Sequence, residues 1–183
     1  MAELCDLEAV ELRRLIGAGE VSPVDLVESC IARIEAADPA VNAITAKAYD
    51  RARAEARAAE AAVRRGDALG PLHGLPIGVK DLSDTEGLLT AYGSPLFADN
   101  VPAADERVVA VLRQAGAIVL AKTNTPEFGA GANTRNAVFG PTRNPFDHEL
   151  TCAGSSGGSA VALACGEVVV RMALPRPPQS RVR

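Results

Sequence analysis

From Gly66 onward, the sequence alternates short apolar runs with turns rich in glycine and proline. Two runs, residues 76–79 (Pro-Ile-Gly-Val) and 117–120 (Ala-Ile-Val-Leu), are short and continuous, as buried strands are. Between them we predict a helix that Asp105 caps and that carries apolar residues at 108, 109, 111 and 112. A helix followed by a glycine turn and a buried strand is a unit of parallel sheets. The pattern therefore predicts an α/β fold with a mostly parallel sheet.

The first third of the chain reads as helices. Residues 6–17 place apolar side chains at helical spacing. Ser22 is a good N-cap and Pro23 suits the first helical position, so a second helix is predicted from there to Asp38-Pro39, which we expect to break it. A third helix is predicted over about 44–65, because this stretch is rich in Ala, Arg and Glu. Its acidic and basic residues interleave, which favours a solvated face over a binding surface for an anionic partner.

Composition narrows the class of protein. The chain has 183 residues, of which 48% are hydrophobic and 23% charged, as in a globular protein with a core of its own. The net charge is −4 and the basic residues form no block before the last few residues, so we expect no direct nucleic-acid ligand. No apolar run could cross a membrane and the N-terminus is acidic. We therefore expect no membrane association and a cytoplasmic location.

Cysteine and histidine residues are few: Cys5, Cys30, Cys152, Cys165, His73 and His148. The cysteines are widely spaced, without a Cys-x-x-Cys pair, so we expect buried or idle thiols and neither a disulfide framework nor a zinc site. No other metal site and no cofactor are expected. Because the two histidines are far apart in the sequence, a histidine-based triad is hard to build. Catalysis would need another base.

The first stretch whose residues could take part in catalysis is 74–81 (Gly-Leu-Pro-Ile-Gly-Val-Lys-Asp), where Lys80 follows a strand that we expect to be buried. The ends of strands are where α/β folds place functional groups, and burial lowers the pKa of a lysine. A neutral Lys80 could act as a general base. By itself, the stretch fits equally a lysine that pairs with Asp81 or extends to the surface.

The second stretch is residues 154–159 (Gly-Ser-Ser-Gly-Gly-Ser), followed by a small-residue helix predicted to start near Ser159. Glycine loops that enter a helix offer free N–H groups to phosphate or to an oxyanion. The phosphate-binding signatures are missing, since no Gly-Lys-Ser/Thr ending and no G-x-G-x-x-G spacing occur. The nucleophile elbow of α/β-hydrolases does not match either. In isolation, a flexible turn or helix cap remains an alternative.

The third stretch is the polar loop of residues 121–129, which continues to residue 146. Long loops are commonly functional or disordered. This loop carries large apolar residues at intervals, namely Phe128, Phe139 and Phe146, and their presence favours an ordered loop that lines a pocket. A purely structural connection is the alternative.

Together, the stretches GLPIGVKD (74–81), AGAIVLAKTNTPEFG (115–129), RNPFD (143–147) and AGSSGGSAVALA (153–164) closely resemble the amidase signature family of amide-hydrolysing enzymes. The resemblance covers about residues 71–167 and weakens towards the start of the chain. It implies the N-terminal portion of an α/β/α sandwich around a mixed sheet. It also implies an enzyme that needs no cofactor and acts on a small-molecule amide; we keep a homodimer as a hypothesis for its assembly.

The resemblance also implies roles for single residues. Lys80 matches the family's catalytic lysine, and Ser155 matches the bridging serine, which in the family usually lies at a cis peptide bond. In the family's mechanism, the neutral lysine withdraws a proton through the bridging serine from a second serine, and that serine attacks the amide to form an acyl-enzyme. Ser156, Gly157 and Asn124 are then expected to shape the substrate site.

The end of the sequence departs from the family. Family members continue with an Asp-x-Gly-Gly-Ser segment that supplies the nucleophile, whereas this chain continues from Arg171 with Arg-Met-Ala-Leu-Pro-Arg-Pro-Pro. Ser180 falls near the expected distance but lacks the flanking glycines, so we do not assign it as the nucleophile. The codons GCG GAT GGC TCT G encode Ala-Asp-Gly-Ser, which is typical of the family just before the nucleophile. Loss of the first base shifts the reading to CGG ATG GCT CTG, which encodes the Arg-Met-Ala-Leu seen at residues 171–174. We therefore expect a frameshifted or truncated chain that is inactive alone.

These observations divide the chain into N-terminal helices (1–66), a partial amidase core (67–170) and an aberrant tail (171–183). Two alternative functions stay open. One is the catalytic subunit of glutamyl-tRNA amidotransferase, although the residues at 80–84 (Lys-Asp-Leu-Ser-Asp) and 92–95 (Tyr-Gly-Ser-Pro) are more typical of stand-alone amidases. The other is a non-catalytic binding module that keeps the pocket without the nucleophile.

Overall fold

The computed structural model describes residues 3–171, so the tail hypothesis and Ser180 lie outside the described residues. The centre of the fold is a four-stranded sheet in the order β1-β3-β2-β8. Its strands are β1 Ile44–Lys47, β2 Pro76–Lys80, β3 Ile118–Thr123 and β8 Val170–Arg171. β2 runs parallel to β3 and β8, whereas β1 runs antiparallel to β3. The predicted α/β fold with a mixed, mostly parallel sheet is confirmed.

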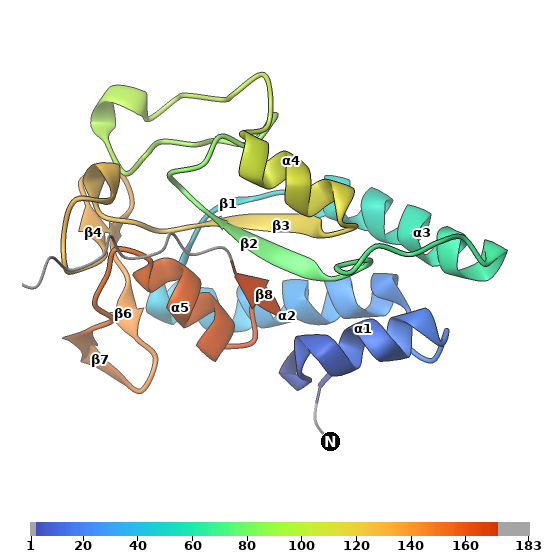
Figure 1. Cartoon of the computed structure of the whole chain (residues 1–183). Helices are drawn as coiled ribbons and strands as arrows, with labels where there is room; N and C mark the ends of the chain where they lie inside the picture. The colour runs from blue at the N-terminus through green and yellow to red at the C-terminus, as the bar shows by residue number, and fades with distance from the viewer. Residues whose placement is uncertain (1–2, 172–183) are drawn as a thin grey trace, which may run out of the picture.

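Helices cover both faces of this sheet (Figure 1). On one face, Ile77, Val79 and Val119 pack against Val109 of α4 (Arg107–Gln114). The other face contributes Ile118 and Leu120 to a larger core with α2 and α5. The helices on this side are α1 Ala9–Gly17, α2 Pro23–Val41, α3 Tyr49–Arg65 and α5 Gly157–Ala164. This larger core takes side chains from both the 1–66 and the 67–170 range, so the two segments fold as neighbours.

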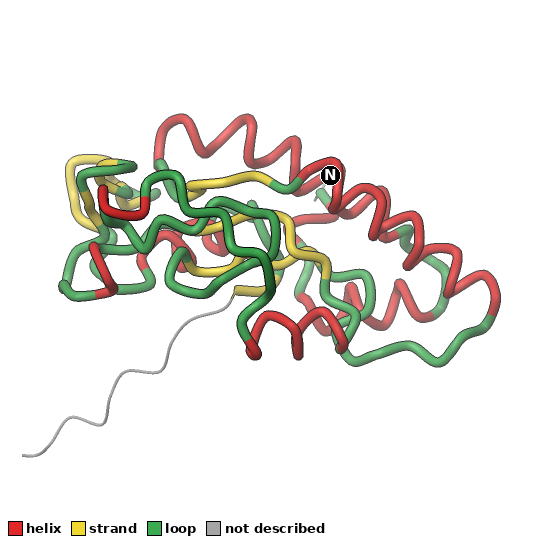
Figure 2. Tube along the Cα trace, turned by 90° about the horizontal axis from the view of Figure 1, so that it is seen from above, coloured by secondary structure: helices red, strands yellow, loops and turns green. Residues whose placement is uncertain are grey.

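Short elements fill the connections, and those of residues 127–151 gather at one end of the molecule (Figures 1 and 2). Two small antiparallel pairs form here: β4 with β5 lies in the predicted polar loop, and β6 near the end of that loop pairs with β7 just beyond it. The bounds are η1 Leu4–Asp6, η2 Pro95–Phe97, η3 Glu127–Gly129, β4 Arg135–Asn136, β5 Gly140–Pro141, β6 Arg143–Asn144 and β7 Asp147–Thr151. Within residues 3–171, no helix has the length and apolarity needed to cross a membrane.

The second helix begins as predicted but ends later. The hydroxyl of Ser22 accepts a hydrogen bond from the backbone N–H of Val24 at 3.0 Å, and Pro23 is the first helical residue. The prediction that Asp38-Pro39 breaks the helix is wrong, since α2 runs on to Val41. Pro39 removes one helical N–H, but the last turn is still closed by the hydrogen bond from the backbone N–H of Asn42 to the carbonyl of Asp38 at 2.7 Å. The Asp38 carboxylate also accepts the backbone N–H groups of Ala43 and Ile44, just beyond the helix.

The predicted helix over 44–65 is also corrected. Residues 44–47 form β1, and the helix begins only at Tyr49 and ends before Gly66, which takes a left-handed conformation. Tertiary pairing decides the difference, because the backbone of residues 44–47 hydrogen-bonds to the free edge of β3. The residue types agree with this in part, because Ile44 and Thr45 are β-branched and suit a strand.

Three smaller expectations change as well. Asp105 does not cap α4. Its carboxylate accepts the backbone N–H of Glu86 at 2.8 Å and forms an ion pair with Arg113, and residue 106 is the N-cap. β3 extends to Thr123, so residues 121–123 are strand and not loop. α5 begins at Gly157, two residues before the predicted start.

The pairing of β2 with β3 passes over one residue, Leu120. Beyond this bulge, Lys80 lies opposite Thr123 and Val79 lies opposite Lys122. Paired residues of neighbouring strands share a face of the sheet. Lys80 therefore lies on the α5 face and Lys122 on the α4 face, whereas an unbulged register would place the two lysines side by side.

Glu167, between α5 and β8, is fully buried, and neither carboxylate oxygen has a hydrogen-bond partner among the described residues. Burial, and secondarily the nearby Asp38, raise its pKa to about 8. The folded-state pKa lies above the unfolded value, so protonation stabilises the fold. That stability is complete at acidic pH and is lost as the pH rises towards 8.

We therefore expect Glu167→Gln, which keeps the shape without the ionisable group, to stabilise the chain at pH 8 by roughly 1–3 kcal/mol. At pH 5 the variant and the wild type should unfold at nearly the same denaturant concentration. Urea unfolding at both pH values measures this. Equal stability of the two proteins at pH 8 would show that the carboxyl group is satisfied by groups other than those described.

Candidate functional site

The structure brings three of the sequence-predicted residues together at the carboxyl end of β2. Lys80 is fully buried, as predicted. Its Nζ atom donates hydrogen bonds to the hydroxyl of Ser155 at 2.8 Å and to that of Ser156 at 3.0 Å. The alternative pairing with Asp81 is not formed, since the Asp81 carboxylate accepts the backbone N–H groups of Ala91 and Gly93 instead.

The electrostatics of Lys80 suit a proton acceptor. Burial lowers its pKa from the ordinary 10.5 to about 8. The shift has desolvation as its only resolved cause. A substantial fraction of the Lys80 amines is therefore neutral at mildly alkaline pH. Such an amine, in contact with two hydroxyls, can take a proton from one of them.

The loop that carries the two serines has an unusual backbone. The peptide bond between Gly154 and Ser155 is cis, as the resemblance implies, and Ala153 takes a φ of +59°. Close packing explains one glycine of the motif, because a Cβ atom on Gly158 would lie 2.4 Å from the backbone N of Asn124. The loop is thus pressed against the end of β3.

Gly157, predicted to shape the substrate site, is the first residue of α5. Its backbone N–H donates to Thr134 Oγ1 at 3.0 Å. A Cβ atom on Gly157 would lie 2.3 Å from the same oxygen, so only glycine fits. The backbone N–H of Gly157 therefore bonds to another residue of the protein in this structure, and a contact of Gly157 with substrate stays a prediction.

Asn124, also predicted to shape the substrate site, is fully buried. Its side-chain N–H groups donate to Gly140 O and Thr142 Oγ1, and its Oδ1 accepts from the backbone of Thr125 and the side chain of Asn136. All of its hydrogen-bonding capacity is satisfied internally. The structure thus shows a scaffolding residue, and a direct substrate contact stays a prediction.

The three phenylalanines of the polar loop differ in their surroundings. Phe139 lines a pocket of about 440 Å³, and Phe128 packs edge-on against Phe97. Phe146 is 88% exposed at the β6–β7 turn. The prediction that Phe146 lines a pocket is wrong, because the hairpin that carries it stands out from the sheet (Figure 1).

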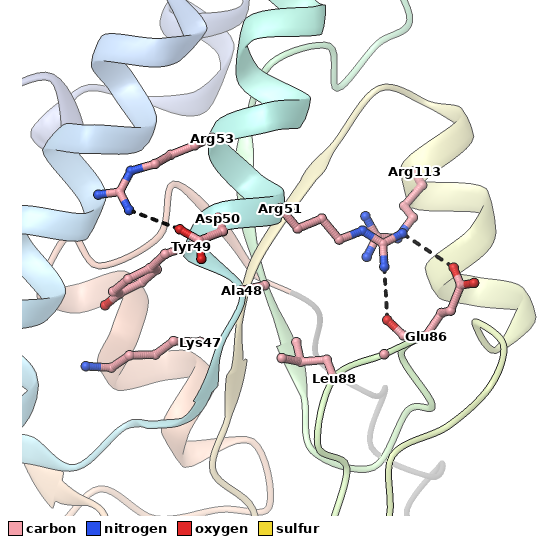
Figure 3. Close-up of a pocket in the computed structure, with 10 residues that line it drawn as sticks. Lys47, Ala48, Tyr49, Asp50, Arg51, Arg53, Glu86, Leu88 and Arg113 are labelled. Atoms are coloured by element: carbon pink, nitrogen blue, oxygen red, sulfur yellow. Dashed lines mark hydrogen bonds and ion pairs between the residues drawn. The ribbon is translucent and has the colours of Figure 1, made fainter.

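A pocket of about 420 Å³ lies elsewhere, between the start of α3 and the loop of residues 86–88 (Figure 3). Four cations line it, and each forms an ion pair with a carboxylate. The pairs are Lys47 with Glu35, Arg51 with Glu86, Arg53 with Asp50 and Arg113 with Glu55. Because these charges are compensated and neither Lys80 nor Ser155 lines the pocket, it is separate from the candidate site.

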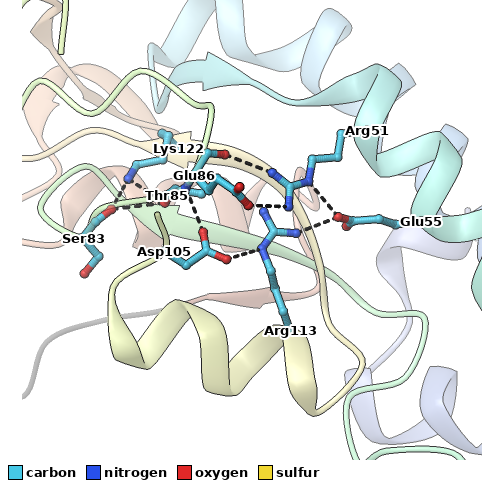
Figure 4. A network of polar contacts seen from close by, with 8 residues as sticks. All are labelled: Arg51, Glu55, Ser83, Thr85, Glu86, Asp105, Arg113 and Lys122. Atoms are coloured by element: carbon cyan, nitrogen blue, oxygen red, sulfur yellow. Dashed lines mark hydrogen bonds and ion pairs between the residues drawn. The ribbon is translucent and has the colours of Figure 1, made fainter. Parts of the chain in front are cut away.

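Sequence reasoning missed a second buried lysine on the α4 face. Lys122 Nζ donates to the backbone carbonyl of Ser83 and, at 3.0 Å each, to the hydroxyls of Thr85 and Thr90 (Figure 4 shows Ser83 and Thr85). The fully buried Asp81 interacts with it electrostatically. A signal was present, since Lys122 ends an apolar strand as Lys80 does. Lys122 holds the loop of residues 83–90 against the sheet.

The four cysteines have free thiols, and burial raises the pKa of each. Burial therefore makes the reactive thiolate form less accessible. In the part of the chain that the structure covers, no group of three or more His, Cys, Asp or Glu side chains could hold a metal ion.

Comparisons with known proteins agree with this geometry. The family model described as Amidase matches residues 25–173. The chain is 44% identical over 167 residues to the A subunit of the glutamyl-tRNA(Gln) amidotransferase of Acidothermus cellulolyticus, covering 91% of this chain and 33% of the relative. It is 46% identical over 165 residues to the corresponding A subunit of Moorella thermoacetica, covering 90% and 34%.

Solved structures give the same result. The chain superimposes on a bacterial aryl acylamidase of the amidase signature enzymes with a TM-score of 0.83 and 36% identity, covering 88% of this chain and 34% of that one. The chain thus spans about one third of the length of the curated relatives it matches.

Proposed function

This chain belongs to the amidase signature family, and on that premise we propose that it contributes Lys80 and Ser155 to a Ser-Ser-Lys site that hydrolyses amide bonds. The observation that carries the proposal is the 2.8 Å hydrogen bond between Lys80 Nζ and Ser155 Oγ at a buried sheet edge. Hydrolysis would be the activity of the protein in which the site is complete. We assign no residue of this chain as the nucleophile.

In the proposed mechanism, neutral Lys80 accepts a proton from the Ser155 hydroxyl. Ser155 in turn accepts a proton from the nucleophilic serine, whose oxygen attacks the carbonyl carbon of the amide. When the tetrahedral intermediate collapses, the C–N bond breaks and the amine leaves with the proton that returns through Ser155. A water molecule then hydrolyses the acyl-enzyme by the same proton path.

The remaining predicted site residues have supporting parts in this proposal. Ser156 gives Lys80 a second hydroxyl contact and so helps to hold its amine in place. Gly157 keeps the loop close to its neighbours, and Asn124 fixes the end of β3. The substrate is proposed to be a small-molecule amide, and a homodimer remains the proposed assembly.

The direct test uses two proteins. One is the purified chain, and the other is a chimera in which residues 1–170 are joined to the C-terminal region of the bacterial aryl acylamidase, of which this chain covers 34%. Both are assayed on a panel of aliphatic, aryl and peptide-terminal amides. We expect the chimera to hydrolyse at least one amide. A folded chimera that turns over none would contradict the proposal and favour a binding module that lacks turnover.

The pH dependence of the chimera is a further prediction. Lys80 must be neutral to accept a proton, and burial lowers its pKa to about 8. We therefore expect kcat/KM to rise with pH and to level off above an apparent pKa near 8. A profile measured at saturating and limiting substrate between pH 6 and pH 10 checks this. A rise centred near the ordinary lysine value would mean that Lys80 is not desolvated in the working enzyme.

A second candidate function is that of an amidotransferase component. The observation in its favour is that the curated relatives from Acidothermus cellulolyticus and Moorella thermoacetica are both named as the A subunit of glutamyl-tRNA(Gln) amidotransferase. In that case the site would act on an amide within a larger complex. Glutamine hydrolysis that depends on added partner subunits would favour this function, whereas hydrolysis of aryl amides by the chimera alone would favour the stand-alone amidase.

A further inference from the structure

We propose that Thr134 is a positioning residue whose hydroxyl closes the loop bearing Ser155 and Ser156, so that both serine hydroxyls reach Lys80. The importance of this arrangement rests on the proposed function. The arrangement itself rests on the contacts of Thr134, which comes from the polar loop and lies more than fifteen residues away in the sequence.

Thr134 joins the two ends of the serine loop. Its Oγ1 donates to the carbonyl of Ala153 at 2.9 Å and accepts the backbone N–H of Gly157 at 3.0 Å. Its own backbone N–H also donates to the Ala153 carbonyl, at 3.0 Å. One hydroxyl thus links the residue before the loop to the residue after it, and only residues 154–156 lie between. With both ends fixed, the short loop has few other conformations available.

The site around the hydroxyl is closed. The Thr134 side chain is 2% exposed. A Cβ atom on Gly157 would lie 2.3 Å from Thr134 Oγ1 and 2.6 Å from Cys152 Sγ, so the oxygen is packed directly against the loop. A water molecule has little room to replace the hydroxyl, and without it the Gly157 N–H would be left buried with no acceptor.

Thr134 is itself anchored to the rest of the fold. Its carbonyl accepts the backbone N–H of Thr142 at 2.9 Å. The Thr142 hydroxyl in turn donates to the carbonyl of Asn42 and accepts from the side chain of Asn124. Through these contacts the serine loop is tied to the end of α2 and to the end of β3. Two further side-chain contacts to this backbone are longer: Thr125 Oγ1 donates to the Ser155 carbonyl at 3.3 Å, and Thr151 Oγ1 accepts the backbone N–H of Ala153 at 3.1 Å.

The test compares Thr134→Val with Thr134→Ser in the full chain. Valine keeps the volume and loses the hydroxyl, whereas serine keeps the hydroxyl and loses a methyl group. Thr45→Val is the matched control, because the Thr45 hydroxyl has no hydrogen-bond partner among the described residues. Two NMR readouts are used: hydrogen exchange of the Gly157 amide, and the titration of the Lys80 side chain. Neither readout requires turnover.

We expect Thr134→Val to accelerate exchange of the Gly157 amide about tenfold or more, since one buried hydrogen bond is lost. The loop should then move from Lys80, and the amine should titrate at a higher pH than the value near 8 of the wild type. Thr134→Ser and Thr45→Val should leave both readouts unchanged. A global loss of stability without local rearrangement would lower the unfolding midpoint and leave the titration of folded Lys80 in place.

Two results would overturn the proposal. In one, folded Thr134→Val shows wild-type exchange at Gly157 and wild-type titration of Lys80. In the other, Thr134→Ser changes both readouts as strongly as valine does, which would assign the effect to packing of the methyl group. If the chimera hydrolyses no amide while both readouts respond as expected, the proposed function fails and the positioning of the two serines by Thr134 stands.

Discussion

Lys80→Ala and Ser155→Ala should each reduce amide hydrolysis by the chimera roughly 10⁴–10⁶-fold, the cost of losing a member of a catalytic triad. Lys80 Nζ and Ser155 Oγ are 2.8 Å apart, so either replacement interrupts the proposed proton path at its centre. The change should fall on kcat more than on KM, because the amine and the hydroxyl act on the proton and not on substrate binding. Steady-state kinetics on the most reactive amide of the panel measures both values.

Matched controls make this result specific. Lys47, a partly exposed lysine that pairs with Glu35, should tolerate replacement by alanine with little change in rate. Because Lys80 and Ser155 act as one unit, the double variant should be hardly slower than either single variant. If the fold losses in rate of the two single variants multiply in the double variant, or if Lys80→Ala keeps most of its activity, another residue acts as the base.

Lys122→Met should lower the free energy of unfolding by about 3–5 kcal/mol, the usual cost of leaving a buried charge without the charge that compensates it. Lys122 and Asp81 are both fully buried. Burial lowers the pKa of Lys122 to about 8 and raises that of Asp81 to about 6, so both are charged near pH 7. For a domain of this size, the loss should move the melting temperature down by roughly 10 °C or more. Thermal melting and urea unfolding of the purified chain measure it.

The electrostatic origin of this effect has its own signature. Without Lys122, the Asp81 carboxylate stays buried with no cation, and its folded-state pKa rises further above the unfolded value. Protonation then stabilises the variant, so its deficit should be smaller at pH 5 than at pH 7.5. Asp81→Asn in the Lys122→Met background should recover part of the lost stability. An equal deficit at both pH values would attribute the loss to the hydrogen bonds with Ser83, Thr85 and Thr90 alone.

Local chemistry made several features of the fold predictable. Ser22 and Pro23 begin α2 because a hydroxyl and a ring without N–H suit that end of a helix. Gly66 ends α3 because the left-handed conformation costs glycine nothing. Features that depend on distant partners were misjudged. Residues 44–47 join β3 as a strand and not the helix that follows, and α2 continues past Pro39 to Val41.

The sequence by itself determined the α/β class, the family and the prediction that Lys80 and Ser155 belong to one site, because motif order and residue types record these directly. Only the tertiary structure decided the surroundings of that site. The bulge at Leu120 sends the two strand-end lysines to opposite faces of the sheet, so that one meets serine hydroxyls and the other holds a loop. The tertiary structure also decided the role of Thr134, whose hydroxyl bonds to Ala153 and Gly157. Sequence patterns report local spacing, whereas register and buried hydrogen bonds are set only when distant segments pack together.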